Sequence, residues 1–482
     1  MEIFKEYGEE YRKLLMSDNI QNKKNAVSFT IALSVYLLIG GLLILNFPQE
    51  GYNDNERQLF ITLLVSYFII MGFVVAAILN RNIYIFEPFS FITLLYVGIF
   101  ILRPIQDLYT HSVSYAGRNL VDSGVKSTIL FTVGYIFFYI GYFMKKNYTE
   151  PEKKLLKKEY PDMTGLLVTM WAFFFICCII CQFSQGFSLR YIFSLGSSGE
   201  REINSNNSLL LFLSNFATSL LVVWIMIIVK SKNDAVKIVI TALTVVYLIM
   251  RNSRWLMLIL ILAPITYFYT KRNKSPKIAY LLSAGFVALV LFAWMQLNRY
   301  NIAMGRTVQG LGEEGLTFQF LMSPFDSDLT TYTTFYGMVG NFPDIHPYML
   351  GRTFLYMFVL FVPRFLWPSK PDNPVRDMVE NSLGSVARIN GRAVANIGEF
   401  YANFGIIGII ILMFVFGYIV SRLKHLYKDP SENRLIIYSV LYPLMFQWVA
   451  RGNFSSNFYY TLFAFIPFIV QYIFINSVRR KR

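Results

Sequence analysis

Arginines at the ends of apolar runs are the residues in this sequence that most suggest chemistry. Arg254 lies at the junction of two apolar runs, Arg299 follows directly on a third, and Arg451 lies between two more. A guanidinium at a membrane edge is costly to place there, and it suits bidentate contact with phosphate or carboxylate. If the three lie at one depth, they suit a phosphate or pyrophosphate carried by a lipid. The alternatives are anchoring in headgroups and salt bridges to acidic residues.

Acidic residues near the same predicted depth are candidates for proton transfer. Glu399 shortly precedes an apolar run, and Asp326 lies in a long segment of mixed charge. A carboxylate partly shielded from water can act as a general base towards a sugar hydroxyl. Each acid is equally a candidate salt-bridge partner. Weaker candidates for sugar or phosphate contacts are Arg364, Lys370, Asn453 and Tyr401.

Several familiar motifs are missing from the sequence. It has three histidines far apart, and it lacks a Walker motif, a GxGxxG loop and HExxH. The sequence therefore predicts no metal cage, no ATP site and no cofactor. Any catalysis would use a substrate that arrives already activated from the membrane.

The elements that must position these residues are membrane helices. Of 482 residues, 55% are hydrophobic and only 15% are charged, which excludes an ordinary soluble enzyme. Apolar runs of about 20 residues recur, the length that crosses a bilayer core. An all-α polytopic membrane protein with about twelve crossings is expected. The predicted runs are 26–47, 59–79, 84–102, 127–144, 164–184, 208–229, 235–250, 255–270, 278–297, 405–422, 434–450 and 457–477.

The net charge of +15 divides unequally between the two sides of this predicted topology. The positive-inside rule puts both termini and 27 of the 44 basic residues in the cytoplasm, and 19 of those 27 are lysine. On the opposite side, 15 of 17 are arginine. Topology and anionic headgroups account for the inner set. The outer arginines are the ones to connect with phosphate chemistry, and no nucleic-acid partner is expected.

Three regions follow from this topology. Residues 1–297 would form nine helices with a cytoplasmic N-terminus, 298–404 one large external loop, and 405–482 three helices with a cytoplasmic C-terminus. Within the loop, the apolar stretch 353–365 is too short to span comfortably and ends at Pro363-Arg364. It predicts a re-entrant or interfacial helix.

The order of short motifs over about residues 235–470 resembles the Wzy-type oligosaccharide repeat-unit polymerases, the family of the O-antigen and enterobacterial common antigen polymerases. The motifs that carry the resemblance are Asn252-Ser253-Arg254, Asn298-Arg299-Tyr300, Pro324-Phe325-Asp326, the stretch 363–371, the stretch Gly398-Glu399-Phe400-Tyr401 to Gly405-Ile406-Ile407-Gly408, and Arg451.

The resemblance implies a GT-C-like, metal-independent glycosyltransferase of the bacterial cytoplasmic membrane. Such an enzyme moves a growing glycan from undecaprenyl pyrophosphate onto an incoming lipid-linked repeat unit, so its partners are these two lipid-linked oligosaccharides and the membrane lipids. A chain-length regulator and a flippase are further candidate partners. In this reading Arg254, Arg299 and Arg451 bind the pyrophosphate, and Glu399 or Asp326 is the base.

Two alternatives stay open at this point. An O-antigen-type ligase would share the fold, but its family places a loop histidine near a Gly-x-x-Gly helix start, where this chain has Asn396 and Glu399. A lipid-linked oligosaccharide flippase or other transporter would favour charges in the middle of helices, which are nearly absent here.

Overall fold

A computed structural model describes residues 51–81, 86–144, 163–184, 208–251, 253–272, 329–362, 366–389, 392–428 and 431–480, together with isolated positions at 41 and between 283 and 296. The first helices are α2 (Asp54–Arg81), α3 (Pro88–Val97), the π-helical turn η1 (Gly98–Leu102), α4 (Arg103–Tyr109), α5 (Val121–Phe143), α6 (Thr164–Ser184), α8 (Ser208–Lys230), α9 (Asp234–Arg251) and α10 (Arg254–Lys271). They are followed by α15 (Thr331–Asn341), α16 (Arg352–Val359), α17 (Pro374–Leu383), α18 (Ser385–Ile389), α19 (Asn396–Arg422), α20 (Lys424–Lys428), α21 (Glu432–Phe446), the π-helical turn η2 (Gln447–Arg451) and α22 (Phe454–Arg480). Strands β1 (Ser114–Tyr115) and β2 (Arg118–Asn119) form a small antiparallel hairpin.

The predicted all-α membrane architecture is confirmed. Seven described helices are long and apolar enough to cross a membrane: 54–79, 88–109, 121–143, 164–182, 212–230, 396–426 and 454–477. The predicted runs 235–250, 255–270 and 434–450 are also helical, as α9, α10 and α21, but they fall short of that combination of length and composition. The runs 26–47 and 278–297 lie largely outside the described residues. The number twelve therefore stays a prediction.

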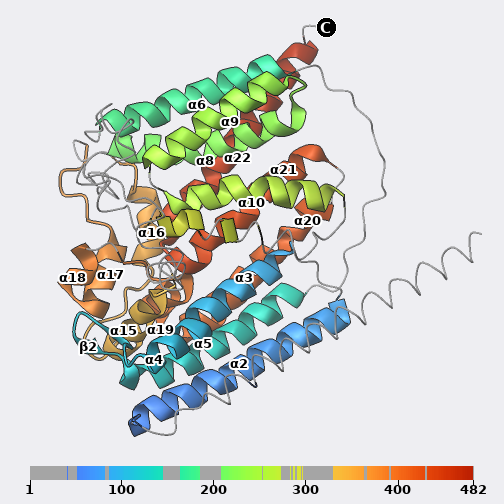
Figure 1. The fold of residues 1–482 in the computed structure, drawn as a ribbon. Helices are drawn as coiled ribbons and strands as arrows, with labels where there is room; N and C mark the ends of the chain where they lie inside the picture. The colour runs from blue at the N-terminus through green and yellow to red at the C-terminus, as the bar shows by residue number, and fades with distance from the viewer. Residues whose placement is uncertain are drawn as a thin grey trace, which may run out of the picture.

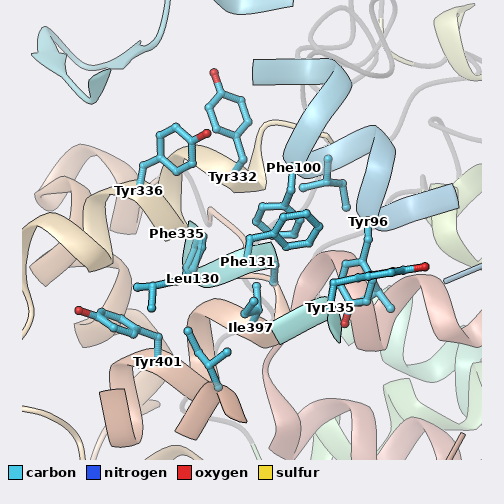
Figure 2. Packing of buried hydrophobic residues seen from close by; sticks show 14 of the residues in the cluster. Tyr96, Phe100, Leu130, Phe131, Tyr135, Tyr332, Phe335, Tyr336, Ile397 and Tyr401 are labelled. Atoms are coloured by element: carbon cyan, nitrogen blue, oxygen red, sulfur yellow. The ribbon is translucent and has the colours of Figure 1, made fainter. Parts of the chain in front are cut away.

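One half of the bundle is built on the close contact between α5 and α19. A Cβ atom on Gly141 would lie 2.1 Å from the carbonyl oxygen of Phe414, and one on Gly417 would lie 2.2 Å from that of Phe138. Small residues at such crossings let helix backbones touch. Figure 2 shows the aromatic core beside this contact, where Phe100 and Phe131 stack with centroids 4.6 Å apart.

The other half consists of α6, α8, α9, α10, α21 and α22, which share a second hydrophobic core. Two tryptophans in this core donate hydrogen bonds in addition to packing through their apolar rings. The indole N–H of Trp171 donates to Thr244, and that of Trp224 donates to Thr241. In Figure 1, α6, α8 and α9 lie on the opposite side of α10 and α21 from α2 and α5.

The two ends of the bundle differ in construction. One end, here called the loop end, carries α15, α16, α17, α18, the β1–β2 hairpin and the N-terminus of α19 (Figure 1). The opposite end, here called the tail end, carries α20, the start of α3 and the C-terminus of α10. At the loop end, α16 has eight residues, a length of about 12 Å, which is too short to cross a bilayer. It ends before the predicted limit at residue 365, and its relation to a membrane stays a prediction.

The start of α19 corrects the sequence prediction. The apolar pattern places a helix start near Gly405, but the helix begins at Asn396 and bends at Phe404 and Gly405. Gly405 has φ +61°, and a Cβ there would lie 2.7 Å from the Tyr348 hydroxyl oxygen. The bend therefore needs glycine. The segment before it was missed because it mixes polar and apolar residues and is buried by the loop-end helices rather than by lipid.

Candidate active site

Two turns that are distant in sequence run side by side at the loop end. The backbone N–H of Val394 donates to the carbonyl oxygen of Arg451 across 3.5 Å. Next to it, Gly452 has φ +57°, and a Cβ there would lie 2.8 Å from the carbonyl oxygen of Ala395. Only a glycine allows this close approach. The contact brings Arg392, at the start of one turn, towards Arg451 in the other.

Glu399 connects the same two segments through hydrogen bonds. Its side chain is only 1% exposed, and its carboxylate oxygens accept the backbone N–H of Phe454 at 2.9 and 3.2 Å. The carboxylate also takes hydrogen bonds from the backbone N–H of Asn453 and the hydroxyl of Thr353. A negative charge at the first residue of α22 is stabilised by the helix dipole. Glu399 therefore fixes the start of α22, and with it the turn of Arg451, relative to α19.

Arg392 is held at the N-terminus of α15 by neutral groups. Its guanidinium donates to the hydroxyls of Thr330 at 2.9 Å and Thr333 at 2.8 Å, and to the Thr330 carbonyl at 3.3 Å. The guanidinium carbon lies 4.6 Å from the centroid of the Tyr115 ring. Its Nε is buried and has no hydrogen-bond partner among the described residues. A cation at the positive end of a helix dipole is unfavourable unless an anion joins it.

Arg103 reaches the same region from α4. Its Nε and Nη2 donate to the two carboxylate oxygens of Asp107 at 3.1 and 2.9 Å. The hydroxyl of Tyr332, on α15, donates to the same carboxylate at 2.5 Å. Asp107 thereby orients Arg103 and ties α4 to α15.

Two other arginines, Arg451 and Arg103, act electrostatically on Arg392. Burial lowers the pKa of the Arg392 guanidinium, and the positive charges of Arg451 and Arg103 lower it further, against the opposite effect of the Tyr115 and Tyr332 hydroxyls. Arg103, Arg392 and Arg451 are called the arginine cluster below.

Two members of the cluster border π-helical turns. Arg103 directly follows η1, and Arg451 is the last residue of η2. Such turns are rare within helices and occur frequently at functional sites. Among the described residues, both π-helical turns lie next to a member of the cluster.

The other predicted site residues lie in different surroundings. Arg254 begins α10 in the second half of the bundle, where the neighbouring Trp255 packs on Tyr460 with ring centroids 4.8 Å apart. Lys370 is buried and donates to the carbonyls of Leu360 and Val362, at the end of α16.

Two weaker candidates are held by local hydrogen bonds. Tyr401 is buried, and its hydroxyl donates to the carbonyl oxygen of Phe342 at 3.0 Å. The side chain of Asn453 accepts from the backbone N–H of Ser456 at 3.4 Å. The structure thus brings together Arg451, Asn453 and Glu399 among the predicted residues. Arg299, Asp326 and Arg364 lie outside the described residues.

The sequence reasoning missed Arg103 and Arg392. Arg103 follows an apolar run directly, as Arg299 does, so the same signal was available for it. Arg392 has no such signal, because it is one arginine among several in a long loop segment. The sequence distinguishes Arg392 only as one of the basic residues predicted to lie outside the cytoplasm, most of which are arginine.

Comparison with known families matches residues 25–482 to the model described as O-antigen polysaccharide polymerase Wzy. No curated protein and no solved structure matches the chain significantly. The match extends the resemblance seen in the motifs to almost the whole length, the N-terminal helices included. The chain therefore belongs to the O-antigen polysaccharide polymerase Wzy family, whose members are multi-pass membrane enzymes that join oligosaccharide repeat units.

Proposed function

We propose that the chain polymerises undecaprenyl-pyrophosphate-linked repeat units at the outer face of the bacterial cytoplasmic membrane, and that the arginine cluster binds the pyrophosphate of the donor. One observation carries the proposal. The charges of Arg103 and Arg451, from two other segments, act on Arg392 beside the N-terminus of α15, and the hydrogen-bond partners of Arg392 among the described residues are all neutral.

The positive charge of the arginine cluster suits a polyanionic group that gains further negative charge during the reaction. When the glycosidic bond to pyrophosphate breaks, the leaving oxygen gains negative charge. Guanidinium groups are planar and always protonated, and they bind phosphate oxygens in pairs. Donors already in place where charge develops stabilise the transition state without reorganising. The same reasoning supports a reaction that runs without a resident metal.

In the proposed reaction, an acceptor hydroxyl oxygen forms a bond to the anomeric carbon of the donor glycan. The bond from that carbon to the pyrophosphate oxygen breaks, and undecaprenyl pyrophosphate leaves. The hydroxyl proton passes to a base. Glu399 is buried and its carboxylate already accepts several hydrogen bonds. We therefore assign Glu399 to positioning Arg451, and Asp326 remains the proposed base.

The proposal includes an orientation. The loop end would face outwards and both termini would lie in the cytoplasm, because the lysine-rich segments alternate with the arginine-rich ones along the chain. Labelling of single cysteines placed at exposed Arg118 and exposed Arg272 with a membrane-impermeant reagent tests this. Only the cysteine at position 118 should react in intact cells.

The test of function uses the full-length purified protein with undecaprenyl-pyrophosphate-linked repeat unit as the only substrate. The expected product is a ladder of lengthening glycans that is unaffected by a chelator. Arg451→Gln should remove the ladder, while Arg272→Gln, an exposed arginine at the tail end, should retain it. A normal ladder from the Arg451 variant would contradict the proposed pyrophosphate site. The absence of any ladder from the unmodified protein would contradict polymerisation.

A further inference from the structure

Helix α16 connects the two halves of the bundle at the loop end. The residue before it lies against the bend of α19, where a Cβ on Gly351 would be 3.2 Å from the Cζ atom of Phe404. Towards its other end, the hydroxyl of Tyr459 on α22 donates to the carbonyl oxygen of Met357 at 2.8 Å. The helix therefore crosses from the α5–α19 half of the bundle to the half that contains α22.

The contacts of α16 all lie near the loop ends of the long helices. Phe404 is in the third turn of α19, and Tyr459 is in the second turn of α22. Phe361, just after α16, lies with its ring centroid 5.4 Å from that of Phe212, which is in the second turn of α8. At 1.5 Å per residue, these three contacts are within about 12 Å of the helix starts. Since both ends of α16 lie at a similar depth, the helix runs across the long helices rather than along them.

A continuous apolar surface leads from the exposed side of α19 to α16. Exposed apolar residues recur at every fourth position of α19, which places them on one side of this membrane-spanning helix, where they face lipid. They are Ile407, Ile411, Val415 and Ile419. The stripe reaches the bend at Phe404, which is 38% exposed and stacks on Phe354 of α16 with ring centroids 6.1 Å apart.

The outer side of α16 has the same apolar character. Leu355 and Phe358, one turn apart, are 62% and 69% exposed, and Leu350, just before the helix, is 74% exposed. Thr353, on the opposite side, is buried. The helix has one charged residue, Arg352 at its first position, and a long basic side chain at that place can reach the headgroup layer. A helix with one apolar exposed side beside a lipid-facing surface is typical of the membrane interface.

A buried polar network fixes the position of α16. Asn403 of α19 donates from its side-chain amide to the hydroxyl of Thr353 at 2.8 Å. The hydroxyl of Ser455 on α22 donates to the carbonyl oxygen of Thr353 at 2.6 Å. Thr353 also donates to the carboxylate of Glu399, which holds the turn of Arg451. The depth of α16 is therefore tied to the depth of this turn.

We propose that α16 lies in the membrane interface and that its Leu355 and Phe358 side is immersed in lipid acyl chains. The occupant is lipid rather than a protein partner, because this side continues the lipid-facing stripe of α19 at the bend where the apolar run of that helix begins. Of the two forms expected from the sequence, re-entrant and interfacial, α16 takes the interfacial one. The membrane contact does not depend on the proposed polymerisation.

Spin-label accessibility of the full-length protein tests this contact. The three native cysteines are replaced by alanine, and Leu355→Cys and Phe358→Cys are made separately, labelled with a nitroxide and placed in nanodiscs of phosphatidylethanolamine and phosphatidylglycerol. Oxygen concentrates among acyl chains, whereas a nickel chelate stays in water, so the ratio of their effects on the label reports its surroundings. Melting temperatures of the labelled variants confirm that each is folded.

Two further labelled positions serve as references. Ile407→Cys lies in the lipid-facing stripe just after the bend of α19, and Arg118→Cys is exposed at the loop end. The ratio of oxygen to nickel effects at positions 355 and 358 should match that at 407 and exceed that at 118.

Any other result at either position overturns the proposal. A ratio as low as that of Arg118→Cys would place this side of α16 in water. Protection of the label from both reagents would show that protein, either another part of the chain or a partner, covers this side in place of lipid.

Discussion

Arg392 at the loop end of the bundle and two lysines at the tail end are held in opposite ways. At the loop end, Arg392 is held by hydroxyls, a carbonyl and an aromatic ring, and it faces the charges of two other arginines. At the tail end, Lys424 forms an ion pair with Glu87, and Lys271 pairs with Glu432 at 3.0 Å.

The difference separates two uses of charge. A lysine paired with a carboxylate contributes to the structure and leaves little net potential. An arginine held by neutral groups keeps its charge available for a ligand. Arg392 is therefore suited to bind an anion, whereas Lys424 and Lys271 are neutralised by carboxylates.

The largest expected effect is a loss of stability when a buried carboxylate at the tail end is removed. Glu87 is buried and also accepts from the hydroxyl of Tyr142 at 2.9 Å, so Glu87→Ala leaves both Lys424 and Tyr142 without this partner. Loss of one member of a buried pair costs about 3–5 kcal/mol. The melting temperature in detergent should fall sharply. The ladder formed per folded molecule should not change, and a selective loss of activity without loss of stability would break the comparison.

The next effect concerns the loop end. Arg392→Gln keeps much of the side-chain volume but removes the charge, and turnover should fall by about 10²–10³-fold, the size seen when one transition-state donor is lost. The melting temperature should stay the same or rise, because a cation at the positive end of α15 is removed. Gel analysis of product length and thermal unfolding check the two halves of this prediction. A large fall in stability would mean that Arg392 is structural.

A smaller effect sharpens the role of Glu399. Glu399→Gln keeps an acceptor but removes the charge that stabilises the start of α22, a change of about 1.5–3 kcal/mol. Because Glu399 is proposed to position Arg451, the KM for the lipid-linked substrate should rise more than kcat falls. The acidic limb of the pH–rate profile should remain in the variant. Its disappearance would show that Glu399 is the base.

The smallest effect is expected at Lys271. Both members of its pair with Glu432 are about half exposed, at 55% and 42%, so the pair contributes under about 1 kcal/mol. Lys271→Ala should leave the ladder unchanged and shift the melting temperature only slightly. A fall in stability as large as that of Glu87→Ala would show that the tail-end pairs act as one network.

The sequence predicted the helices better than the site. Apolar runs of about 20 residues mark membrane helices because no water is available to their backbones. Arg451 stood out for the same reason, as a charge at the end of such a run. The start of α19 did not, because residues 396–403 are buried by other protein segments and carry no lipid-facing pattern.

Contacts between segments that are distant in sequence could not be predicted from local sequence patterns. The sequence marks Glu399 as a candidate acid, but its partner is the start of α22, which lies 55 residues further along the chain. Arg392 depends on the approach of Gly452 to Ala395, which no local pattern reveals. The sequence predicts a sugar or phosphate contact for Lys370, whereas its ammonium group donates to carbonyls at the end of α16, which its neighbours in sequence do not indicate.

The π-helical turns at Arg103 and Arg451 separate the packing of a helix in the core from the direction of the arginine that follows it. A π turn holds one residue more than an α turn, so the residues beyond it are offset by about 100° around the helix axis. The face of α3 or α21 that packs in the bundle and the direction of the arginine that follows can then be chosen independently. Removal of one residue from either turn would therefore turn the arginine that follows away from its present direction.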